Sequence, residues 1–191
     1  MRTLFLLLFT IVFSVSYGQV SPLSGLYLAK EFSKEQALYK AKEYVMTEII
    51  NTDSDVTKFE LDPLAAANSG ELTSLVYRCD EQGLGGLVLG FFGDRWNENG
   101  VIYQAYAFRN LEESEAFAVL QRIETIMDEQ SKYIGSDSNT NNVVFKFDDM
   151  TFLMYEDGST KIRVFWNGFD AEWEESAFNR TRRRFARKID G

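Results

Sequence analysis

A stripe of apolar residues between Ala116 and Ile134 constrains the fold more than any other feature of this sequence. Its members recur every three or four positions, which places them on one face of an α-helix. Asn110 and Glu113 precede the stripe at the spacing of a capping box, and Gly135 follows it as a stop signal. The stripe consists of Ala116, Val119, Leu120, Ile123, Met127 and Ile134. Because such a face must be buried, the sequence predicts a helix packed on the strands around it.

Short apolar segments bounded by turn residues predict seven β-strands in the rest of the chain. They are Val56–Leu61, Leu72–Cys79, Leu84–Phe92, Val101–Phe108, Val143–Phe147, Met150–Tyr155 and Lys161–Trp166. Asp62 and Pro63 mark the predicted end of the first strand, and the glycines of 83–90 indicate a bulge or a close backbone approach. Two more helices are predicted, at Ser33–Asn51 and from about Ala171 to Ile189, the latter capped by Asp170. Strands joined by short turns pair in antiparallel fashion.

The fold class predicted from these elements is α+β. We expect a twisted antiparallel sheet of about seven strands with three helices packed against it, in the order α-ββββ-α-βββ-α. No linker long enough to divide domains interrupts this order, so residues 19–191 are predicted to form a single globular domain.

The first 18 residues have the three parts of a secretory signal peptide. Arg2 precedes the apolar run Leu4–Val15, and Ser16 and Gly18 supply small residues before a cleavage site at Gln19. An uncleaved membrane anchor is the alternative, but a bilayer span needs about 20 apolar residues and this run is shorter. The sequence therefore predicts export to the periplasm or the extracellular space, with no transmembrane segment after cleavage.

Charge and composition exclude several classes of function. Residues 20–170 hold 13 Lys and Arg against 25 Asp and Glu, a net of −12, which is unsuited to nucleic acid. The chain contains no histidine, so most nucleophilic triads, most zinc sites and the commonest general base are missing. Cys79 is alone, which predicts a buried hydrophobe or an intermolecular disulfide rather than a nucleophile. We expect no cofactor.

Two groups of residues are candidate ligand contacts. The loop Gly93–Gly100 places a tryptophan among hydrogen-bonding side chains, and a second aromatic group surrounds the end of the last predicted strand. A flat apolar ring beside directional polar groups suits a sugar or a peptide. The candidates are Asp94, Arg95, Trp96, Asn97, Trp166, Asn167 and Trp173. The commoner alternative is that these aromatic rings cover the sheet end and anchor the last helix.

Acidic residues in predicted turns are weaker candidates for a functional site than these two groups. Asp137, Asn139 and Asn141 follow the spacing that opens a calcium loop, but Asn142 replaces its glycine and the closing glutamate is missing. Asp148 with Asp149, and Glu156 with Asp157, would supply paired carboxylates for glycoside hydrolysis. Ordinary turn chemistry accounts for all of them.

The end of the chain is basic. Residues 171–191 hold 6 Lys and Arg against 4 Asp and Glu, a net of +2. The basic-patch candidates are Arg180, Arg182, Arg183, Arg184, Arg187 and Lys188. This cluster would bind an anionic lipid, a polysaccharide or the acidic body of another subunit. The alternative is a solvated helix end that complements its own dipole.

These features predict an exported, non-enzymatic domain that binds a protein or glycan partner. Two alternatives stay open: a hydrolase that uses Asp or Glu on polysaccharide, and an envelope protein that self-associates through its basic helix. The hydrolase requires two carboxylates from different elements to converge beside an aromatic ring, for example Asp94 or Glu98 with Asp148 or Asp149.

Overall fold

A computed structural model describes residues 36–51, 56–96, 98–100, 102–137 and 140–189, with only the backbone described at 96, 102 and 103. The described residues from Lys40 onward belong to one compact unit, and residues 36–39, which are helical, belong to another. The predicted signal peptide, residues 1–18, and the predicted N-cap Ser33 lie outside the described residues.

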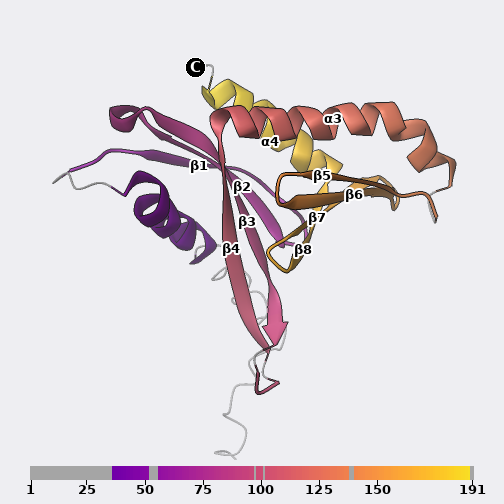
Figure 1. Cartoon of the computed structure of the whole chain (residues 1–191), viewed down its shortest axis with the longest axis horizontal. Coiled ribbons are helices and arrows are strands. Elements are labelled where there is room, and N and C mark those ends of the chain that lie inside the picture. Colours follow the sequence, from indigo (N-terminus) through magenta and orange to yellow (C-terminus); the bar gives the residue numbers. More distant parts are fainter. Residues whose placement is uncertain (1–35, 52–55, 97, 101, 138–139, 190–191) are drawn as a thin grey trace, which may run out of the picture. The chain divides into compact units, whose positions relative to one another are not determined.

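The described strands form two four-stranded antiparallel sheets (Figure 1). The first contains, in spatial order, β1 (Glu60–Ala66), β2 (Leu72–Cys79), β3 (Leu84–Trp96) and β4 (Ile102–Glu112). The second contains β5 (Val143–Phe147), β6 (Met150–Glu156), β7 (Thr160–Trp166) and β8 (Phe169–Glu174). The α+β class is confirmed. The prediction of one seven-stranded sheet is wrong, because the chain starts a second sheet after its central helix and adds a further strand to it.

The strand missing from the prediction is β8. Asn167 and Gly168 both have positive φ, 48° and 72°, and form the two-residue turn that joins β7 to β8. In β8, Ala171 and Trp173 are buried and alternate with the more exposed Asp170 and Glu172. The predicted helix start at Asp170 is therefore wrong, and the last helix, α4 (Glu175–Ile189), begins after the strand.

The central helix, α3 (Glu113–Ser136), buries the stripe that the sequence predicts, except that Met127 is only partly buried. The predicted cap at Asn110 is wrong. Asn110 still pairs with Val88 in the sheet, because β4 continues to Glu112, where the helix begins without a side-chain cap.

The first strand runs through the residues predicted to end it. Asp62 and Pro63 pair with β2, and the register then shifts between Pro63 and Ala65, so that Leu64 has no partner in the ladder. Proline, which lacks an N–H donor, is tolerated here because β1 is an edge strand. Leu64 is thus the extra residue of a bulge, and its side chain is buried.

The first sheet buries both of its faces. On one face, Leu87, Leu89 and Phe91 share a core with α3, α4 and the inner residues of the second sheet, among them Phe152 and Trp173. The opposite face carries buried Leu75, Tyr77, Val88 and Phe108, and the ring of Phe108 lies 5.4 Å from that of Tyr44 in the first helix. That helix ends as a π-helix, η1 (Val45–Ile50), and a short 3-10 turn, η2 (Asp80–Gln82), joins β2 to β3.

Candidate functional site

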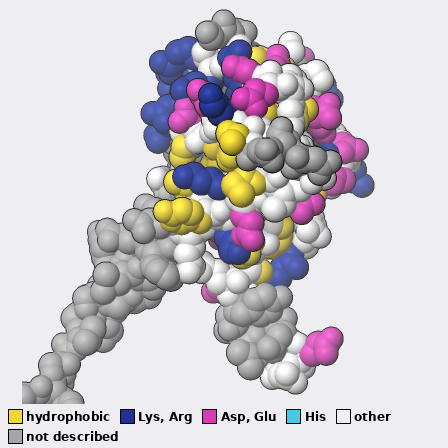
Figure 2. Space-filling model, turned by 90° about the vertical axis from the view of Figure 1, so that its left-hand side faces the viewer, with side chains coloured by type: hydrophobic (Ala, Val, Ile, Leu, Met, Phe, Trp, Pro, Cys, Tyr) yellow, Lys and Arg dark blue, Asp and Glu magenta, His cyan; other side chains and the backbone are white. Residues whose placement is uncertain are grey.

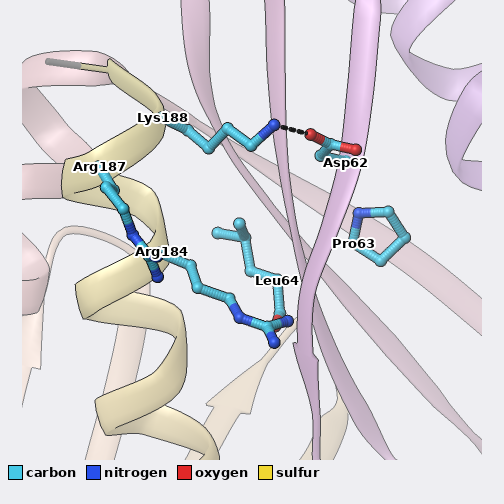
Figure 3. Close-up of a pocket in the computed structure, with 6 residues that line it drawn as sticks. All are labelled: Asp62, Pro63, Leu64, Arg184, Arg187 and Lys188. Atoms are coloured by element: carbon cyan, nitrogen blue, oxygen red, sulfur yellow. Dashed lines mark hydrogen bonds and ion pairs between the residues drawn. The ribbon is translucent and has the colours of Figure 1, made fainter. Parts of the chain in front are cut away.

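A pocket of about 310 Å³ lies between the edge strand β1 and the C-terminal half of α4 (Figure 3). Figure 2 shows Lys and Arg side chains gathered toward the top of one face, at the height of the C-terminal end of α4 in Figure 1. The pocket is lined by Asp62, Pro63, Leu64, Arg184, Arg187 and Lys188. Three basic side chains thus share the pocket with one carboxylate, in a chain whose formal net charge is −9.

The amphipathic character of α4 positions these basic residues. Phe178, Thr181 and Phe185 are buried, and the Thr181 hydroxyl lies 2.6 Å from the hydroxyl of Ser74 on β2. This face fixes the rotation of the helix, and the basic residues of the last two turns then lie beside β1.

Arg184 forms a hydrogen bond with the backbone at the bulge in β1. Its Nη1 donates a hydrogen bond of 2.6 Å to the carbonyl oxygen of Leu64, the residue without a partner in the ladder. A carbonyl freed from a sheet needs another donor, and Arg184 provides it. This contact holds the guanidinium of Arg184 against the backbone of β1 (Figure 3).

Lys188 and Arg187 differ in their contacts. The Nζ of Lys188 forms an ion pair with Asp62, and both side chains are about half exposed. The hydrogen bond to Asp62 raises the pKa of Lys188 above its ordinary value, so this side chain is cationic at neutral pH. Arg187 is exposed and forms no ion pair or hydrogen bond with the described part of the chain. It is therefore available to a ligand.

The remaining predicted basic residues lie outside the pocket. Arg182 pairs with Glu124 of α3 at 2.7 Å, and the Nε of Arg183 donates to the Asn179 carbonyl within the helix. Arg180 is exposed and does not line the pocket. The predicted patch is thus divided. Some of its residues line the pocket, and the others pair with neighbouring residues or are exposed to solvent on α4.

Three of the predicted ligand candidates come together at the β7–β8 turn. Arg95 donates a hydrogen bond of 2.6 Å to the carbonyl of Asn167, and its guanidinium lies 4.1 Å from the ring centre of Phe169. The ring of Trp166 packs 5.1 Å from that of Phe91. These contacts join the β3–β4 hairpin to the second sheet, so they hold the two sheets together.

Two of the other ligand candidates, Trp173 and Asp94, do not join this group. Trp173 is 1% exposed and meets Phe178 edge to face, which makes it part of the core. Asp94 is exposed on β3. Asn97 and the side chain of Trp96 lie outside the described residues.

A polar network that the sequence did not indicate surrounds Arg109 of β4. Its guanidinium contacts Asp148 at 2.6 Å, Asp149 at 3.0 Å and Glu115 at 3.0 Å. The indole Nε1 of Trp166 donates to the second oxygen of Asp149 at 2.7 Å. The available signal was the alternation of β4, where Arg109 occupies the face that also carries the buried Leu111.

This network bears on the predicted role of Asp149 as a catalytic acid. Carboxylates from the β5–β6 turn do lie beside Trp166, but each is bound to Arg109. Burial alone would raise the pKa of Asp149, whereas the hydrogen bonds from Trp166 and Arg109 outweigh it and hold that pKa below its ordinary value. A glycosidase acid needs a raised pKa, so Asp149 is unsuited to the role.

The lowered pKa of Asp149 predicts a pH dependence of stability. A depressed carboxyl pKa contributes stability that is present above the unfolded value of about 4 and is lost as the pH falls through the folded value. Asp149→Asn is therefore expected to make the free energy of unfolding less dependent on pH between about pH 5 and pH 2. Urea denaturation at several pH values measures this slope. Asp128→Asn, at an exposed position of α3, should leave the slope unchanged.

Two of the residues predicted to bind calcium, Asp137 and Asn141, form hydrogen bonds at the C-terminal end of α3. The side-chain amide of Asn141 donates to the Tyr133 carbonyl and to the Ser136 hydroxyl, and the carbonyl of Asp137 accepts the backbone N–H of Asn141. Asn139 lies outside the described residues. Within the described part of the chain, no group of three or more acidic or cysteine side chains is arranged to hold a metal ion. Cys79 is fully buried at the end of β2, with its thiol free.

No protein-family model matches the sequence, and neither a curated protein nor a solved structure is significantly similar to the chain. Among the residues that the structure describes, no helix is long and apolar enough to cross a bilayer.

Proposed function

We propose that the protein is an exported, non-enzymatic binding domain that holds an acidic segment of a protein partner in the pocket between β1 and α4. The observation that carries this proposal is the charge of the pocket: Arg184, Arg187 and Lys188 line it together with a single carboxylate, Asp62. Cationic side chains converging on a concave surface are what an anionic group needs for recognition.

The lining of the pocket supports a protein partner over a glycan. Its apolar surface comes from Pro63 and Leu64, and none of the six lining residues is aromatic. Sugar-binding sites usually stack a pyranose on an aromatic ring, whereas the carboxylate of an Asp or Glu side chain needs only the cationic groups. Asp62 itself shows that a side-chain carboxylate reaches Lys188 here.

The acidic remainder of the chain supports selectivity. Residues 20–170 carry a net charge of −12, so most of the sequence repels an anionic partner. An acidic segment is therefore attracted to the basic end of α4 and repelled elsewhere, which orients the encounter.

The test is the affinity of the purified protein for short poly-L-glutamate, measured by calorimetry at several salt concentrations. Replacing Arg187 and Lys188 by glutamine removes two positive charges from the pocket and is expected to weaken binding by about tenfold. The matched control replaces Arg180 and Arg183 by glutamine, which removes two charges from the same helix outside the pocket. The control should stay within about twofold of the wild type.

Equal losses in both double variants would contradict the proposal, because the helix would then bind through its overall charge. Tighter binding of polygalacturonate than of polyglutamate would indicate an acidic glycan instead. Binding that is replaced by salt-dependent association between copies of the chain would favour self-association.

A further inference from the structure

We propose that Asp62 occupies the anion position of the pocket in the free protein, and that an Asp or Glu carboxylate of the partner displaces it from Lys188. This inference rests on the proposed function and adds the exchange by which the partner enters. In Figure 3 the side chains of Asp62 and Lys188 point toward each other across the pocket, while Arg184 reaches Leu64.

The contacts of the three basic residues identify Lys188 as the position of exchange. Arg184 is committed to the Leu64 carbonyl, which has no other partner in the ladder. Arg187 forms no ion pair with the described residues and adds a second cation to the pocket lining. An acidic segment in the pocket meets the charges of both Arg187 and Lys188, whereas Asp62 forms an ion pair with Lys188 alone.

The exposure of the pair makes the exchange feasible. The side chain of Lys188 is 53% exposed and that of Asp62 is 48% exposed. Ion pairs at this exposure are weak, because water solvates both partners when they separate. After exchange, Asp62 returns to solvent on the edge strand without leaving a buried charge unpaired.

Asp62 also opposes the ligand. Its negative charge lies within the pocket and repels an incoming carboxylate. A single carboxylate gains little over Asp62, whereas a segment with several acidic residues places another carboxylate near Arg187 and gains more. The pocket is therefore expected to prefer runs of acidic residues to isolated ones.

The experiment compares Asp62→Asn with the wild type in binding of poly-L-glutamate. Asp62→Asn frees Lys188 and is expected to raise the affinity about three- to tenfold. Glu60→Gln is the matched control, because it removes the same charge from the same strand, and Glu60 attracts Lys188 only through the weaker Coulombic interaction without the hydrogen bond that Asp62 makes. The control should raise the affinity by less than about twofold.

A variant that combines Asp62→Asn with Lys188→Gln tests the mechanism. If most of the gain comes from releasing Lys188, Asp62→Asn should give a much smaller gain when Lys188 is absent, because only the repulsion by Asp62 is then relieved. An equal gain with or without Lys188, or equal gains from Asp62→Asn and Glu60→Gln, would overturn the exchange. The pocket itself would still be supported if the variant lacking Arg187 and Lys188 lost binding. Failure of both the wild type and Asp62→Asn to bind would overturn both proposals.

Discussion

Replacing Arg109 by methionine is expected to lower the free energy of unfolding by about 3 kcal/mol. The guanidinium contacts Asp148, Asp149 and Glu115, and the side chain of Arg109 is only 19% exposed. Methionine fills a similar volume and leaves three carboxylates close together without a cation. The repulsion between these carboxylates and the loss of their hydrogen bonds to Arg109 destabilise the junction of β4, α3 and the β5–β6 turn.

Urea denaturation at neutral pH measures this loss. Arg122→Met is the matched control, because it makes the same substitution at an exposed position of α3 and should change stability by less than about 0.5 kcal/mol. The difference between Arg109→Met and the wild type should also shrink as the pH falls and the carboxylates become protonated. A loss no larger than that of the control would show that the network does not stabilise the fold.

Replacing Gly86 by alanine is expected to cost about 3 kcal/mol or more. A Cβ atom at this position would lie 2.3 Å from the Leu111 carbonyl oxygen and 2.8 Å from the hydroxyl oxygen of Tyr77. The carbonyl belongs to the backbone of β4, and Gly86 is paired on both sides, with Tyr77 and with Glu112. The strands must therefore separate to accept the methyl group.

Gly85→Ala is the control for this prediction. A Cβ atom at Gly85 would have its nearest neighbour at 3.7 Å, which is ordinary contact. Thermal and urea unfolding should therefore show a small change for Gly85→Ala and a large one for Gly86→Ala. Similar stabilities of the two variants would mean that β3 and β4 shift apart at little cost.

The sequence predicted the elements whose patterns are local. The stripe of α3 recurs with helical spacing, and the strand Leu72–Cys79 was predicted with its observed bounds. The close backbone approach expected among the glycines of 83–90 is found at Gly86. In each case the information lies within a few neighbouring residues.

The failures arose where two local patterns competed or where no local pattern existed. The acidic residues after Asn167 and Gly168 resembled a helix start, but the two-residue turn and the alternation of β8 prevailed. The division into two sheets follows from packing between distant residues, which periodicity does not encode. The basic residues of the pocket were predicted, but their partners were not, since Arg184 contacts a carbonyl 120 positions earlier in the chain.

Every strand in the two sheets pairs only with its neighbours in the sequence, so the sheets form through short loops at low entropic cost. By contrast, α4 is the last described element and returns to β1 and β2 across more than half of the chain. A ribosome releases this helix after the strands have been made. The helix that packs against β1 and β2 also carries all three cations that line the pocket, so the contacts that dock this helix also assemble the pocket. The pocket therefore forms only after both β1 and this helix have been synthesised.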